Sequence, residues 1–142
     1  LMAEFDNFRR RTSQEKLELV SVASMDTIKG LLPVGSHVIT SNLEHNSVRR
    51  PLEALVSNGT ISLDKAEVCK DGRMLDSANI CRTIDNLMRN NTAAVVMTAC
   101  PNIFSAALPI TEIGRLCRRR GILFIVDGAQ AAGHYPLDMQ SM

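Results

Sequence analysis

Four stretches of the chain carry the apolar pattern of β-strands, at residues 37–40, 60–68, 93–99 and 122–126. The last two are continuous apolar runs rather than alternating ones, which is typical of parallel strands covered on both faces. We therefore expect these two segments to be parallel strands covered on both faces.

Apolar residues recur at helical spacing between these runs. The pattern predicts a helix over residues 47–58, provided that Pro51 lies in its first turn, and another that begins after Ser77 as N-cap. An N-terminal helix is expected from Thr12 or Ser13 to about Leu32.

The last helix has the clearest boundary signals. Pro109 is expected in its first turn, the three arginines at 118–120 fill its last turn, and Gly121 follows. Because strands and helices alternate, the sequence predicts an α/β fold with a mostly parallel sheet and flanking helices. Residues 1–142 are expected to form one domain, part of a larger one.

Composition narrows the class of protein. The 142 residues are 45% hydrophobic and 22% charged with a net charge of +1, which favours neither a nucleic acid nor a membrane as partner. Four cysteines without metal-ligand spacing are expected to be reduced residues near the core. These features predict a cytoplasmic protein.

Polar residues follow three of the predicted strands. Residues 41–46 read SNLEHN, residues 100–102 read CPN, and residues 127–130 read DGAQ. In open α/β sheets, ligands bind outside the carboxyl ends of the strands. These groups therefore form a candidate binding site.

Each candidate residue also has an ordinary structural interpretation. Asp127 is either a turn residue or a buried carboxylate that needs a cation, such as a protonated ring nitrogen. His45 is either a loop histidine or a ring that stacks on a planar ligand and moves protons. Asn102 and Gln130 either hold loops together or donate to a ligand oxygen. Dinucleotide, P-loop and serine nucleophile motifs are absent from the sequence.

Three segments, at 44–55, 95–122 and 123–140, resemble the class V aminotransferases, with cysteine desulfurases and selenocysteine lyases as the nearest branch. These are pyridoxal-phosphate enzymes of fold type I. The resemblance implies that pyridoxal 5'-phosphate is the cofactor, that a cysteine-like amino acid is the substrate, and that the protein is a homodimer. The implied reaction removes sulfur or selenium and leaves alanine.

The resemblance also implies a role for each candidate. His45 would stack on the cofactor ring and assist proton transfer, and Asp127 would pair with the protonated pyridine nitrogen. Gln130 would donate to the phenolic oxygen of the ring, with Asn102 beside the same edge.

The chain departs from the family at several positions. The Schiff-base lysine is absent, since all four lysines (Lys16, Lys29, Lys65 and Lys70) precede the VDGAQ stretch. The small residues of the phosphate-binding turn are missing from residues 15–26, and Ser105 stands where the family has glycine. Cys100 is not the persulfide cysteine, which would lie outside the chain.

We therefore expect a fragment or truncated relative of a desulfurase, which is inactive alone. The first alternative is a non-catalytic or degenerate α/β module that binds a partner through uncovered apolar surface. The second is a receiver-like domain with Asp127 as acceptor, an analogy at the level of fold.

Overall fold

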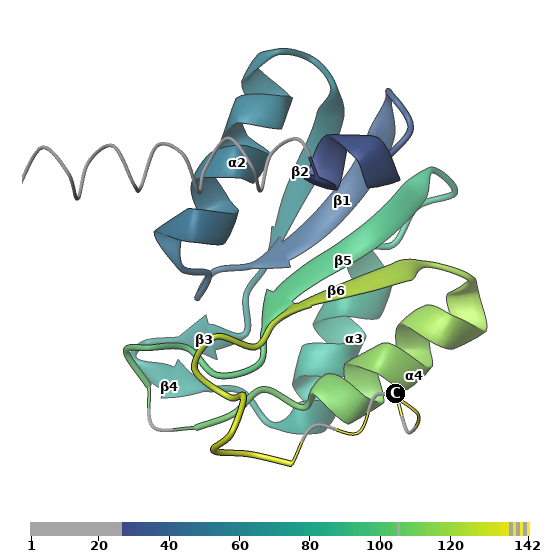
Figure 1. Cartoon of the computed structure of the whole chain (residues 1–142). Helices are drawn as coiled ribbons and strands as arrows, with labels where there is room; N and C mark the ends of the chain where they lie inside the picture. Colours follow the sequence, from purple (N-terminus) through teal and green to yellow (C-terminus); the bar gives the residue numbers. More distant parts are fainter. Residues whose placement is uncertain (1–26, 105, 137, 139, 141) are drawn as a thin grey trace, which may run out of the picture.

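The computed structural model describes residues 27–142 except 105, 137, 139 and 141 (Figure 1). Four parallel strands form the main sheet: β1 (Ser36–Ser41), β2 (Ile61–Ala66), β5 (Thr92–Thr98) and β6 (Leu123–Asp127). Their order is β2-β1-β5-β6, and all four point the same way (Figure 1). The predicted α/β fold with a parallel sheet is therefore confirmed.

Helices cover both faces of this sheet (Figure 1). Helix α2 (Asn46–Ser57) lies on one face, while α3 (Ser77–Leu87) and α4 (Ile110–Arg120) lie on the other. Neighbouring residues of β1 point to opposite faces, so Val38 packs on the α2 side and Ile39 on the α3 and α4 side. Residues 27–31 are also helical, and Ile28 packs on the α2 side.

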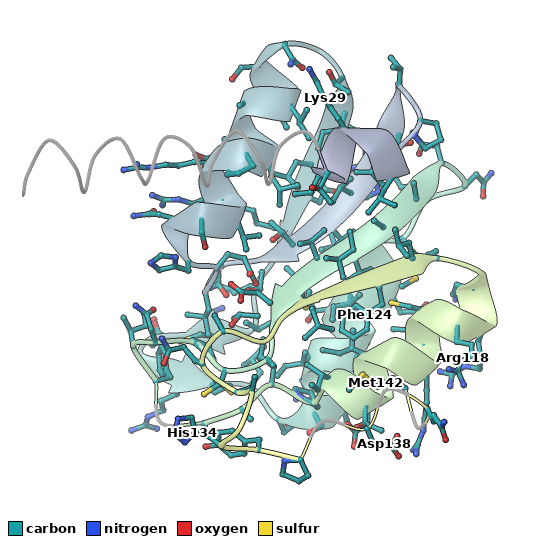
Figure 2. The ribbon with its side chains drawn as sticks, viewed as in Figure 1. Lys29, Arg118, Phe124, His134, Asp138 and Met142 are labelled. Carbon is teal, nitrogen blue, oxygen red and sulfur yellow. The ribbon has the colours of Figure 1, made fainter. Side chains whose placement is uncertain are left out.

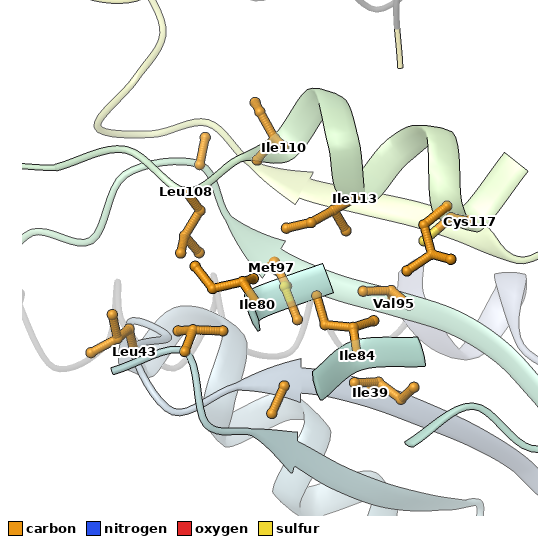
Figure 3. Packing of buried hydrophobic residues seen from close by; sticks show 14 of the residues in the cluster. Ile39, Leu43, Ile80, Ile84, Val95, Met97, Leu108, Ile110, Ile113 and Cys117 are labelled. Atoms are coloured by element: carbon orange, nitrogen blue, oxygen red, sulfur yellow. The ribbon is translucent and has the colours of Figure 1, made fainter. Parts of the chain in front are cut away.

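The larger core lies between the sheet and helices α3 and α4. Phe124 of β6 and Met142 belong to this side (Figure 2). Figure 3 shows Ile80 and Ile84 of α3 and Ile113 of α4 against Val95 and Met97 of β5. These apolar stripes fix how the helices lie on the sheet, and therefore where the loops at its carboxyl end meet.

Two predicted helix boundaries were wrong in detail. Asp76, not Ser77, is the N-cap of α3, and its side chain accepts from the N–H of Asn79. Pro109 is the N-cap of α4 rather than a first-turn residue, whereas Gly121 ends this helix at φ +66° as its position indicated.

Pro51 lies beyond the first turn of α2 and is buried. The expectation that this helix would tolerate proline only in its first turn was wrong. Proline removes one backbone donor from the helix ladder, and the remaining hydrogen bonds together with the apolar contacts of Leu52 and Leu55 with the sheet accommodate that loss.

A small hairpin lies outside the main sheet and was not predicted. Strands β3 (Cys69–Lys70) and β4 (Arg73–Met74) pair antiparallel across Asp71 and Gly72. Both turn residues have positive φ, +50° and +73°, as a type I′ hairpin turn requires. The Asp-Gly pair was the sequence signal for this hairpin.

The strand at residues 123–127 differs from its prediction. β5 is buried along nearly its whole length, but β6 is the edge of the described sheet, and Leu123 is 42% exposed. Both faces of β6 contact a core, through Phe124 and Val126 on one side and Ile125 on the other, but the strand is only partly buried. Strand order, which local composition does not encode, decides this difference.

Candidate functional site

Three loops meet at the carboxyl end of the parallel sheet, after β1, β5 and β6 (Figure 1). The chain runs from β1 to β2 on one side and then crosses to β5 on the other, so β1 and β5 flank a topological switch point. A cavity of about 230 Å³ lies at this edge. It is lined by Leu43, His45, Ser47, Thr98, Cys100, Pro101, Asn102, Asp127, Ala129 and Gln130.

All four predicted site residues line this one cavity. His45 comes from the loop after β1, Asn102 from the loop after β5, and Asp127 and Gln130 from the end of β6 and the turn beyond it. The fold therefore brings together residues that are as far apart in the sequence as His45 and Gln130. The role of each in binding a cofactor stays a prediction.

His45 has a structural function that the sequence did not reveal. It is the N-cap of α2, and its Nδ1 atom accepts a hydrogen bond of 3.2 Å from the backbone N–H of Ser47. Oγ of Ser47 lies 2.9 Å from the same nitrogen. A backbone N–H can donate only to a lone pair, so the neutral ring carries its proton on Nε2. The cap thus fixes both the tautomer and the orientation of the ring.

Asp127 combines the two interpretations that its sequence left open. Its Oδ1 atom accepts a hydrogen bond of 3.0 Å from the N–H of Ala129, which makes it a turn residue. The side chain also lines the cavity and is half-buried rather than enclosed. The side chain of Asp127 therefore both holds the turn and borders the cavity.

The two amides, Asn102 and Gln130, are exposed at the cavity. Among the residues that the structure describes, no side-chain hydrogen bond ties either amide to the protein. The interpretation of these residues as loop ties gains no support here, and their donors and acceptors are available to a ligand.

Glu44 was not assigned a role from the sequence. Its Oε1 atom accepts a hydrogen bond of 3.0 Å from the N–H of Thr98 and another from the hydroxyl of Ser41. Burial raises the pKa of Glu44 above its usual value, and the nearby charge of Asp127 contributes in the same direction. The sequence signal that could have identified Glu44 was its position between the end of a predicted strand and His45.

The cavity is lined by polar side chains from all three loops. No group of three potential metal ligands occurs in the described part of the chain, and no lysine from that part lines the cavity. Asp127 is the one carboxylate among the lining residues. An aromatic ring with a protonated nitrogen fits this set of donors and acceptors.

Comparison with known proteins places the chain in a family. A profile of the family described as aminotransferase class-V matches residues 8–142. The chain belongs to the class-V aminotransferase family. The resemblance stated from the sequence is therefore confirmed.

Relatives of this class-V chain include proteins named cysteine desulfurase. Cysteine desulfurase IscS of Shewanella sediminis is 36% identical over 120 residues, which cover 76% of this chain and 25% of that protein. The solved structure of SspA in complex with cysteine has a TM-score of 0.73 at 25% identity, and covers 86% of this chain and 35% of that one. For the solved structure of the cysteine desulfurase CsdA of Escherichia coli, the TM-score is 0.70 at 19% identity. The match covers 87% of this chain and 30% of that one.

The class-V chain thus spans between a quarter and about a third of the length of these proteins. Within this span, the parallel sheet and its flanking helices match those of the solved structures, which confirms the predicted fold class. Residues 15–26, from which the small residues of the phosphate-binding turn are missing, lie outside the described residues, as does most of the predicted N-terminal helix. None of the described helices is both long and apolar enough to cross a membrane.

All four cysteines are free, and two of them, Cys100 and Cys117, are buried. Cys69 and Cys81 are only partly buried, beside the larger core. Burial raises the pKa of Cys117 to about 11, with a smaller contribution from Cys81. A thiol with a raised pKa is a poor nucleophile, which fits the prediction of structural cysteines.

Proposed function

We propose that this chain forms the ring-binding part of a pyridoxal-phosphate-dependent enzyme that removes sulfur or selenium from cysteine or selenocysteine and leaves alanine. The observation that carries the proposal is the cavity at the switch point, where His45, Asn102, Asp127 and Gln130 come together. Relatives named cysteine desulfurase, and a solved structure in complex with cysteine, support the choice of substrate.

Each side chain has a separate part in this proposal. Pyridoxal phosphate, when bound, supplies an electron sink for charge that develops on the substrate. The free oxygen of Asp127 accepts from the protonated ring nitrogen, and the amide of Gln130 donates to the phenolic oxygen. His45 lies against the ring with its proton on Nε2, where that proton can be transferred. Asn102 borders the edge of the ring that carries the phenolic oxygen.

Binding of the ring alone tests the proposal, because it needs no lysine. Pyridoxamine 5'-phosphate has an amine in place of the aldehyde, so it cannot bond covalently to lysine. Calorimetric titration in a phosphate-free buffer should show saturable binding to the protein. Inorganic phosphate in the same titration separates ring binding from binding of the phosphate alone.

Asp127→Asn provides the decisive variant. The asparagine oxygen can still accept from Ala129, so the turn is retained while the charge is lost. We expect affinity for pyridoxamine phosphate to fall about tenfold to a hundredfold, the scale of one lost charged hydrogen bond. Asp76→Asn, at the N-cap of α3 and away from the cavity, is the control. Unchanged affinity in Asp127→Asn, or no saturable binding by the unaltered protein, would overturn the proposal.

A second candidate is a non-catalytic module that binds a partner chain. Ile103, 72% exposed, and Tyr135, 43% exposed, leave apolar surface uncovered. The homodimer that the family resemblance implies would use such surface. Separately, the four free cysteines support a cytoplasmic location. Light scattering that gives a monomer mass over a wide concentration range would count against both the module and the dimer.

A further inference from the structure

The carboxyl group of Glu44 bridges the ends of two neighbouring strands. Its Oε1 atom accepts a hydrogen bond of 3.0 Å from the backbone N–H of Thr98, the last residue of β5. The same oxygen accepts a hydrogen bond from the hydroxyl group of Ser41, the last residue of β1. Oγ of Ser41 in turn accepts a hydrogen bond of 3.1 Å from the N–H of Leu43. One carboxyl group therefore holds the turn that leaves β1 against the end of β5.

The two ends of this bridge carry residues that flank the cavity. Glu44 directly precedes His45, and Thr98 is paired with Asp127 in the register of β5 and β6. The N–H of Ala99 also donates a hydrogen bond of 2.8 Å to the carbonyl of Asp127. We propose that Glu44 is a positioning residue that sets the spacing between His45 and Asp127 across the cavity. The identity of the cavity's occupant, a substituted pyridine ring, rests on the proposed function, whereas the bridge itself does not.

The surroundings of Glu44 make its charged form less favourable than it is in water. Its Oε2 atom is inaccessible to solvent and has no hydrogen-bond partner in the described part of the chain. An ionised carboxylate would bury charge on this atom without compensation. Burial raises the pKa of Glu44 and so does the charge of Asp127, whereas the hydrogen bonds from Ser41 and Thr98 oppose the shift.

The geometry of the bridge depends on an acceptor at one position. Oε1 accepts from both donors, and an amide oxygen in the same place can accept the same two hydrogen bonds. The bridge therefore needs the length and the acceptor of glutamate.

Two substitutions separate positioning from simple packing. Glu44→Gln keeps a carbonyl acceptor on a neutral group of the same length, whereas Glu44→Leu keeps the volume without the acceptor. Glu53→Leu is the matched control, because Glu53 lies on α2, outside the cavity, with its carboxylate exposed and 3.0 Å from Lys65.

Three measurements are made on each variant of the protein: the affinity for pyridoxamine 5'-phosphate, the exchange rate of the Thr98 amide without ligand, and the NMR shifts of the His45 ring and the Asp127 carboxyl carbon. Glu44→Leu should lower the affinity about tenfold or more, the effect of misplacing a binding group slightly. Its Thr98 amide should exchange faster, and both site resonances should move. Glu44→Gln and Glu53→Leu should resemble the unaltered protein in all three.

The outcomes separate this inference from the proposed function. Unchanged Thr98 exchange or unmoved site resonances in Glu44→Leu would overturn the positioning role, even if no ligand binds. Unaltered affinity in Glu44→Leu would also overturn it. Failure of the unaltered protein to bind the ligand would instead overturn the proposed function, and the two ligand-free measurements would still decide the bridge. If Glu44→Leu does not fold, Ser41→Ala removes the hydroxyl that donates to Glu44 and accepts from Leu43, leaves the hydrogen bond from Thr98, and should give smaller shifts of the same resonances.

Discussion

The backbone N–H of Ser47 donates a hydrogen bond of 3.2 Å to Nδ1 of His45, so a residue that lines the cavity also caps helix α2. Stability of this helix and orientation of the ring therefore depend on one side chain. A substitution at position 45 changes both, unless the new residue can cap the helix without presenting a ring.

His45→Asn and His45→Ala should separate these two functions. Asparagine is a good N-cap, whereas alanine should cost about 1 kcal/mol of stability. Urea unfolding should therefore show His45→Asn close to the unaltered protein and His45→Ala below it. Both variants should bind pyridoxamine phosphate more weakly, because neither has a ring to lie against the ligand. A loss of binding that tracked stability alone would contradict this separation.

Gly114 of α4 is in close contact with the end of the described chain. A Cβ atom added at Gly114 would lie 2.5 Å from Cβ of Met142 and 3.0 Å from its Cα, so one of the two segments must move. Gly114→Ala should therefore destabilise the protein by about 1–3 kcal/mol despite the better helix propensity of alanine. Denaturant unfolding and the NMR shift of the Met142 methyl group measure the effect.

Gly30→Ala is the control for this prediction. Residue 30 is also helical, and nothing lies within 4 Å of an added Cβ atom. We expect that substitution to be neutral or to stabilise the protein by about 0.5–1 kcal/mol. If both substitutions stabilised the protein equally, the contact with Met142 would not constrain α4.

His37 should make the stability of the protein depend on pH. The side chain is fully buried, with Nδ1 2.8 Å from Oγ1 of Thr92 and Nε2 3.2 Å from Oδ2 of Asp64. Burial lowers the pKa of His37 below its ordinary value of 6.5, and the positive charge of Arg89 acts in the same direction, whereas the charge of Asp64 and its hydrogen bond oppose the shift. The folded protein thus keeps this ring neutral at pH values where the unfolded chain binds a proton.

The sign of the pH effect follows from this difference. As pH falls below 6.5, the unfolded state gains a proton that the folded state does not, so the free energy of unfolding falls. The slope from one such group is at most about 1.4 kcal/mol per pH unit. His37→Gln should reduce the slope measured by urea unfolding between pH 5 and 7. An equal slope in the variant would exclude His37 as its source.

The positions of the main elements could be predicted because each depends on a local pattern. Apolar runs predict the strands β1, β5 and β6, and apolar stripes predict the helices α3 and α4. Neither signal depends on where the element lies in the fold. Capping was less predictable. The cap acceptor of α3 is Asp76 although Ser77 beside it is an equally good cap by type, and His45 is an unusual cap for α2.

The candidate site shows the same division. The sequence identified Asp127 and His45 as strand-end residues with two interpretations each, and the resemblance favoured the functional one. Only the folded chain shows that Asp127 holds a turn through one oxygen while it lines a cavity. Glu44 could not be recognised in the same way, because its two donors come from different strands.

The sequence by itself determined the alternation of strands and helices, the family and the residues at the strand ends, because periodicity and motif are properties of neighbouring residues. The tertiary structure decided that β6 lies at the edge of the described sheet, that four distant residues share one cavity, and that Glu44 bridges β1 and β5. These features depend on strand order and on hydrogen bonds between segments far apart in the chain. No local pattern of hydrophobic and polar residues encodes such contacts.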